Sequence, residues 1–171
     1  MNAGDDVKAD AVDLRRAQWA RELPELDTEP MAVLGRIWRI ANVVAPGIEA
    51  TFRGFGLERG EFDVISTLRR SGPPYRLTPT DLYTMLMISS GGLTHRLDRL
   101  ERAGLIRREQ SPQDGRSRVV ALTEEGARGA EQACRADMEQ EASTLAGLEP
   151  SDRAELATLL RKLALVLEAP E

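Results

Sequence analysis

The chain has 171 residues, enough for one compact domain with a hydrophobic core or for a helical dimer that shares one. Its composition, 42% hydrophobic and 30% charged, excludes a disordered chain, and no apolar run approaches the ~20 residues of a membrane-spanning helix. The N-terminus lacks the positive start and apolar stretch of an export signal. We therefore expect a cytoplasmic protein, and the single cysteine, Cys134, fits a reducing compartment.

The net charge of -5 hides a segregation of charge along the chain. Residues 1–30 carry 4 basic and 8 acidic side chains, residues 31–122 carry 14 and 9, and residues 123–171 carry 5 and 11. A basic middle between acidic ends indicates that the middle contacts an anion, although a chance distribution of solvated charge is the alternative. Lys8 and Lys162 are the only lysines, a bias that we attribute to a GC-rich bacterial genome.

The first part of the chain predicts two helices. Apolar residues at helical spacing indicate a helix over residues 5–22, which ends before Pro24. Thr28 can cap a second helix, from about Met31 to Phe52, with a bend near Pro46.

Three shorter helices follow. Residues 61–70 form the first, with Phe62, Ile65 and Leu68 inward, and Thr78 starts the second over residues 81–87. The third lies within SSGGLTHRLDRLERAG, where serines can cap its start and a glycine ends it. Leucines at i, i+4 and i+7 mark its buried side: Leu93, Leu97 and Leu100. The polar side chains that then point outward are His95, Asp98, Arg99 and Arg102.

The periodicity then changes to that of a two-stranded ribbon, LIRREQ and RVVALT, joined by SPQDGRSR. Arg116 and Arg118 stand at this hairpin, where a guanidinium suits the negative minor groove of DNA, and Asp114 can brace Arg116 or the turn backbone. A soluble turn whose arginines make no contact is the alternative. The predicted elements follow the order helix, turn, short helix, turn, basic helix and ribbon. This is the order of a winged helix-turn-helix.

Two more helices are predicted at the C-terminus, one capped by Thr123 and one starting at Pro150 with a wide leucine face. We therefore expect a mainly α fold with a small β-wing, as a homodimer built from the N- and C-terminal helices. Residues 1–53 would form an extra helix and a dimerisation helix, residues 54–122 the DNA-binding lobe, and residues 123–171 the C-terminal dimerisation helices of one intertwined domain.

Residues 77–126, LTPTDLYTMLMISSGGLTHRLDRLERAGLIRREQSPQDGRSRVVALTEEG, resemble the DNA-binding lobe of the multiple antibiotic resistance regulator (MarR) family. The resemblance implies a homodimeric DNA-binding regulator, usually a repressor of a pseudo-palindromic operator, whose DNA affinity falls when a small molecule binds. It implies that the DNA-contacting residues are Ser90, Thr94, His95, Arg99, Asp114, Arg116 and Arg118, with Arg116 in the minor groove.

The extra N-terminal helix and the motifs LDTEPM, GEFDVISTLRRSGPPY and LTHRLDRLERAG resemble a narrower urate-responsive branch that includes HucR, MftR and PecS. This likeness implies a ligand site of Trp19, Asp63, Arg96 and Arg108. Arg96 lies at the edge of the buried face of its helix, where Asp63 would offset the cost of desolvating it. The alternative for Trp19 is a hydrophobic anchor of the extra helix.

Other classes of function have less support. His95 is the only histidine, and no nucleophile or metal-ligand spacing accompanies it, so we expect no enzyme, no catalytic residue, no metal and no cofactor. A non-DNA-binding winged-helix protein that binds another regulator is the main alternative. Several questions stay open: the regulated genes, the operator, whether the protein represses or activates, and any redox role of Cys134. The identity of the effector is open as well, with urate, xanthine, another purine and an unrelated aromatic acid as the alternatives.

Overall fold

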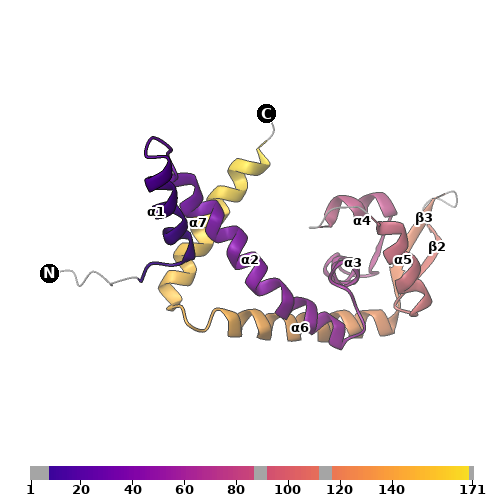
Figure 1. Cartoon of the computed structure of the whole chain (residues 1–171). Helices are drawn as coiled ribbons and strands as arrows, with labels where there is room; N and C mark the ends of the chain where they lie inside the picture. The colour runs from indigo at the N-terminus through magenta and orange to yellow at the C-terminus, as the bar shows by residue number, and fades with distance from the viewer. Residues whose placement is uncertain (1–7, 87–91, 112–116, 170–171) are drawn as a thin grey trace. The chain divides into compact units, whose positions relative to one another are not determined.

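The computed structural model describes residues 8–86, 92–111 and 117–169 (Figure 1). The chain divides into two compact units, Met1–Pro46 and Gly47–Glu171. The described residues form seven helices and a small sheet, which confirms the predicted mainly α fold with a β-wing. The elements are α1 (Ala11–Glu22), α2 (Glu29–Gly54), α3 (Arg59–Arg70), β1 (Arg76–Leu77), α4 (Pro79–Met85), α5 (Leu93–Arg102), β2 (Ile106–Gln110), β3 (Arg118–Leu122), α6 (Glu124–Thr144) and α7 (Pro150–Glu168).

In the first unit, α1 is fixed at its N-terminal end. The Asp10 carboxylate accepts hydrogen bonds from the backbone N–H groups of Val12 (2.7 Å) and Asp13 (3.0 Å), and the Asp13 carboxylate accepts from the backbone N–H of Asp10. This capping box satisfies donors that the helix itself leaves unpaired. Arg36 of α2 then binds both carboxylates, at 2.9 Å and 2.8 Å, so the cap also holds α1 against α2.

We expect Arg36→Ala to loosen α1 from α2 and to speed hydrogen exchange at the amides of residues 11–22, whereas Arg39→Ala leaves it unchanged. Hydrogen bonding by Arg36 is the main cause of the lowered pKa of Asp13, and the backbone N–H of Asp13 is the main cause of the lowered pKa of Asp10. Both pKa values lie below the ordinary 3.8. The stability that the bonds of Arg36 to Asp10 and Asp13 contribute is therefore present above that pH, and it is lost as the pH falls through the two lowered pKa values. Equal exchange in both variants would contradict this role.

The second unit has a core assembled from α2, α3, α4, α5, α6 and the sheet. Residues of α3 and α5 predicted to point inward pack in the core: Ile65 and Leu68 are fully buried, Leu97 and Leu100 almost so, and Leu93 is partly buried. Phe62 is partly buried and stacks on Phe52 of α2 with ring centroids 4.2 Å apart. The periodicity of the short helices therefore predicted their inner faces correctly.

The sheet has three strands in the order β1-β3-β2, all antiparallel, so the predicted two-stranded ribbon was incomplete. In the added strand, Arg76 pairs with Ala121 and Leu77 with Val120. A two-residue strand has no alternating pattern of its own, and its pairing is supplied by residues more than forty positions later. The predicted ribbon itself is confirmed, with Ile106 opposite Leu122 and Gln110 opposite Arg118.

Two predicted helix caps differ in the structure. α5 begins after Gly92, whose φ of 84° suits glycine, and its N-cap makes no side-chain hydrogen bond, so the described N-cap is not a serine. At the start of α2, the Asp27 carboxylate accepts from the N–H of Glu29, while the Thr28 hydroxyl accepts from Arg16. The caps predicted at Thr78 and Thr123 are confirmed, because their hydroxyls accept from backbone N–H groups at 3.1 Å and 2.9 Å.

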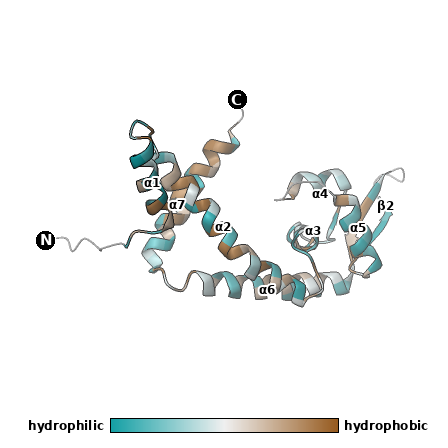
Figure 2. Cartoon of the chain, viewed as in Figure 1, coloured by the Kyte–Doolittle hydropathy of each residue, from teal (hydrophilic) through white to brown (hydrophobic). Residues whose placement is uncertain are grey.

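Large apolar side chains are exposed on the helices near both ends of the chain. Figure 2 shows hydrophobic residues along α2 and α7. The most exposed include Trp38, Val43, Val166 and Leu167, each at least 70% exposed. A single chain does not cover these residues, which is unusual for such large apolar side chains in a monomeric protein. Within the described residues, no helix meets the length and hydrophobicity needed to cross a membrane.

Candidate DNA interface and adjoining cavity

The predicted DNA-contacting residues divide into three groups in the structure. Thr94 and His95 on α5 and Arg118 at the start of β3 are exposed, and β2 packs beside α5 (Figure 1). Ser90, Asp114 and Arg116 lie outside the described residues. The described part therefore gives an accessible helix face next to an accessible arginine on the wing, which is the arrangement that DNA readout by helix and wing requires.

Arg99 is the remaining predicted DNA contact. It forms ion pairs with Glu61 of α3 and with Glu58, the residue that precedes α3. Its guanidinium is 2.7 Å from a carboxylate oxygen of Glu61 and 2.6 Å from one of Glu58. Glu61 is only 2% exposed, so Arg99 supplies the counter-charge of a buried carboxylate. Sequence reasoning missed this role, because the spacing of α5 indicates which side chains point outward but not which acid lies opposite them.

Arg108 connects β2 to α5. Its guanidinium binds the carboxylates of Asp98 (2.6 Å) and Glu101 (3.1 Å), and its backbone N–H donates to Glu101 as well. These contacts place the Arg108 side chain on α5, and it is absent from the lining of the cavity described below, although the likeness to the urate-responsive branch implied a ligand role.

The other residues implied for the ligand site are spread over the structure. Arg96 lies against α3, where a Cβ built on Gly60 would be 2.5 Å from its Nε. Asp63 and Arg96 both have interaction partners. Trp19 is 44% exposed and belongs to the other compact unit.

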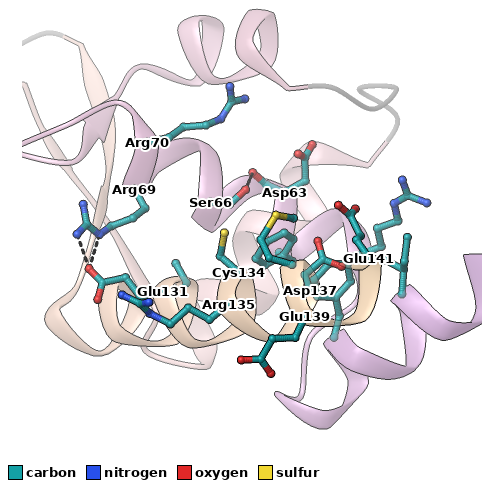
Figure 3. Close-up of a pocket in the computed structure, with 16 residues that line it drawn as sticks. Asp63, Ser66, Arg69, Arg70, Glu131, Cys134, Arg135, Asp137, Glu139 and Glu141 are labelled. Carbon is teal, nitrogen blue, oxygen red and sulfur yellow. Dashed lines mark hydrogen bonds and ion pairs between the residues drawn. The ribbon is translucent and has the colours of Figure 1, made fainter. Parts of the chain in front are cut away.

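A cavity of about 1020 Å³ lies in the second unit, between the C-terminal part of α2, α3 and α6 (Figure 3). Of the four residues implied for the ligand site, Asp63 is the one that lines it. Its lining combines apolar and charged side chains, including Ile48, Phe52, Arg59, Phe62, Asp63, Ser66, Arg69, Glu131, Cys134, Asp137, Met138 and Glu141. Its size suits a small organic molecule.

The charges of the cavity are organised into two regions. On one side Arg69 binds Glu131, and its guanidinium carbon lies 4.7 Å from the ring centroid of Tyr75. The hydrogen bond from Arg69 is the main cause of the lowered pKa of Glu131. Elsewhere on α6, burial raises the pKa values of Asp137 and Glu141. Sequence reasoning predicted neither acid as a site residue, because acids on a polar helix look like a solvated face.

Other candidate chemistry is sparse in this region. Among the described residues, no group of three or more histidine, cysteine and acidic side chains is arranged to hold a metal ion. Cys134 is an exposed free thiol that also lines the cavity. The features of the described residues that suit binding are thus the α5 and wing surface and the cavity between α3 and α6.

Helices α3 to α5 followed by the β2–β3 wing define a winged helix-turn-helix protein. A model of the MarR family matches residues 55–117, which contain α3, α4, α5 and β2 of this lobe. The HTH-type transcriptional regulator PecS of Dickeya dadantii is 36% identical over 146 residues, which cover 85% of this chain and 88% of that protein. The chain belongs to the MarR family of transcriptional regulators, a family of DNA-binding proteins and not of enzymes.

Solved structures agree with this assignment. The apo MarR of E. coli is 27% identical, with a TM-score of 0.63 over 76% of this chain and 96% of that one. Sco3205 of Streptomyces coelicolor, a MarR family regulator solved in complex with DNA, has a TM-score of 0.72 at 23% identity and covers 84% of this chain and 91% of its own. BpsR of Bordetella bronchiseptica, whose DNA binding is regulated by 6-hydroxynicotinic acid, has a TM-score of 0.70 at 23% identity, with 85% and 100% covered.

Proposed function

We propose that this transcriptional regulator is a cytoplasmic homodimeric repressor that binds a pseudo-palindromic operator and releases it when a small molecule binds. The observation that carries the proposal is the accessible face of α5, with Thr94 and His95, beside a wing that exposes Arg118. Helix residues read base edges in the major groove, and a wing arginine binds the minor groove. Ser90, Asp114 and Arg116 complete the proposed DNA-binding set, and Arg99 joins it as a residue that positions α5.

The proposed dimer would bury the exposed apolar side chains near the chain ends. Residues 1–53 and 123–171 carry these side chains, and residues 54–122 form the DNA-binding lobe of the same domain. A two-fold dimer presents two recognition helices to two half-sites, which gives the operator its pseudo-palindromic symmetry.

The cavity is the proposed site of the effector. It adjoins α3, which packs against α5, so a molecule bound there acts on the element that supports the recognition helix. The likeness to the urate-responsive branch makes urate or a related purine the first effector to test. In that proposal Asp63 contacts the molecule, and the other ligand-binding residues are Trp19, Arg96 and Arg108. The effector response of BpsR, a protein of the same fold, supports a small-molecule response here.

DNA binding is tested by titrating the protein onto fluorescent DNA from immediately upstream of its own gene, against a scrambled duplex, at two salt concentrations. We expect specific binding that weakens steeply with salt, because arginine contacts to phosphates release counterions. Arg116→Ala should weaken binding and reduce the salt slope by about 1 if Arg116 contacts a phosphate in the groove, whereas Arg15→Ala should change neither quantity.

A repeat with urate tests the response. Weaker operator binding with urate supports the effector class, and unchanged binding leaves the repressor without that effector. Equal and feeble binding to both duplexes, with no salt dependence, would instead favour a winged-helix protein that binds another regulator.

A further inference from the structure

One wall of the cavity is apolar. The rings of Phe52 and Phe62 are stacked 4.2 Å apart with an interplanar angle of 18°, and both residues line the cavity together with Ile48 and Met138. Aromatic and aliphatic walls of this kind bind planar rings through offset stacking and burial of apolar surface. The shape of the cavity therefore favours a ligand with an aromatic ring.

A buried carboxylate lines the same cavity. Asp137 of α6 is 7% exposed, and its Oδ1 accepts no hydrogen bond from the residues that the structure describes. Burial raises the pKa of Asp137, as expected for a buried carboxylate with too few hydrogen-bond donors to stabilise its charge. Glu141 lies one helical turn further along α6, and after its burial the charge of Asp137 is the next cause of its raised pKa. The charge of Asp137 thus disfavours the charged form of Glu141, and both acids line the cavity (Figure 3).

The basic side chains of the cavity do not fully neutralise this pair. Arg69 is bound to Glu131, and Arg70 donates to the Thr67 hydroxyl and to the carbonyl oxygen of Met85. Arg59 lowers the pKa values of both acids, yet it forms no ion pair with the residues that the structure describes. Arg135 lines the cavity as well, but the acids among the described lining residues, Asp63, Glu131, Asp137, Glu139 and Glu141, outnumber its four arginines, so a positively charged donor is the group that this part of the cavity accepts.

We propose that the cavity binds a planar aromatic ligand with a cationic amine or amidinium head, which donates hydrogen bonds to Asp137 and Glu141 while its ring packs on Phe62, Ile48 and Met138. This inference rests on the proposed effector role of the cavity and gives the ligand a charge opposite to that of urate. The cation supplies the buried Oδ1 of Asp137 with a donor, and it reduces the repulsion between the two acids.

Three probes of the same ring and different charge test the proposal: benzamidine, which is a cation at neutral pH, benzamide, which is neutral, and benzoate, which is an anion. Their binding to the full-length protein is measured by ligand-observed NMR titration. We expect benzamidine to bind at least about tenfold more tightly than benzamide, the range of one charge-assisted hydrogen bond, and benzoate to bind most weakly.

Asp137→Asn keeps the size of the side chain and removes its charge, so we expect it to reduce the preference for benzamidine by about tenfold. Glu141→Gln provides a second variant in case the first misfolds, and Glu155→Gln on α7, outside the cavity lining, is the matched control. Preferred binding of benzoate, lost in Arg59→Met, would overturn the proposal in favour of an anion site. Equal binding of the three probes, or binding of none, would overturn it as well.

The operator titration separates this proposal from the proposed function. If benzamidine binds with the expected preference and weakens operator binding, the effector-released repressor and the cation site are both supported, and urate is not the ligand of this cavity. If the protein binds its operator specifically but shows no preference for the cation, the repressor stands and the ligand class is wrong. If the cation is preferred but no specific DNA binding is found, the site is supported and the repressor is wrong.

Discussion

Gly126→Ala is expected to destabilise the protein by about 3 kcal/mol, because it forces a methyl group into the backbone beneath α6. A Cβ at this position would lie 1.9 Å from the carbonyl oxygen of Leu105 and 2.8 Å from its carbonyl carbon. Both are backbone atoms that cannot rotate away. The same stretch is held by Thr123, whose hydroxyl caps α6 and also donates to the carbonyl oxygen of Gly104 or Leu105.

Thermal unfolding measures this effect, and a loss of about 6–12 °C in Tm corresponds to the expected free energy for a chain of this size. Gly129→Ala is the matched control, since it lies on the same helix with no atom within 4 Å of the added Cβ. Alanine favours a helix interior over glycine by about 1 kcal/mol, so this control should raise Tm slightly. Equal Tm values for the two variants would show that α6 does not sit on Leu105 as described.

Arg99→Ala is expected to cost about 2–3 kcal/mol of folding free energy, because it leaves the buried Glu61 carboxylate without its counter-charge. The side chain of Arg99 is 37% exposed and that of Glu61 only 3%, so solvent screens one partner and the penalty falls below that of a fully buried pair. Operator binding should weaken too, since α5 loses its connection to the start of α3. Chemical denaturation and the operator titration measure the two effects separately.

Arg102→Ala serves as the comparison, because Arg102 is exposed on the same helix and binds only the carbonyl oxygen of Asp98 among the described residues. The free energy of unfolding of the Arg102→Ala variant should differ from that of the unmodified protein by less than about 0.5 kcal/mol. Adding Glu61→Gln to Arg99→Ala should recover part of the stability, because the buried charge is removed with its partner. If Arg99→Ala weakened DNA binding with full stability, Arg99 would be a DNA contact alone.

The helices of the DNA-binding lobe could be predicted because their signals are local. The leucine stripe of α5, the threonine caps of α4 and α6, and the loss of helical periodicity at β2 and β3 each depend on residues a few positions apart. β1 could not be predicted, since its two residues become a strand only through pairing with Val120 and Ala121. The N-cap of α5 was also missed, because Gly92 acts through its backbone conformation and not through a side chain.

The candidate site was predictable to a smaller extent. Outward-facing residues of α5 follow from helical periodicity, and the resemblance to known regulators indicated Asp63, which does line the cavity. The same periodicity cannot show that Glu61 is buried or that Asp137 faces a cavity, because burial depends on which helix packs opposite. Charged residues are usually exposed, so an acid on a polar helix is interpreted as solvated unless the structure shows otherwise.

The bonds from Arg108 to Asp98 and Glu101 have a mechanical consequence for DNA release. They join the base of the wing to α5, so we expect a displacement of α5 to carry the base of the wing with it. A displacement of α3 that tilts α5 would then withdraw the wing in the same movement, and groove contacts on both sides of a half-site would be lost together. If the proposed effector acts in this way, we expect the helix and wing contacts with DNA to be lost together.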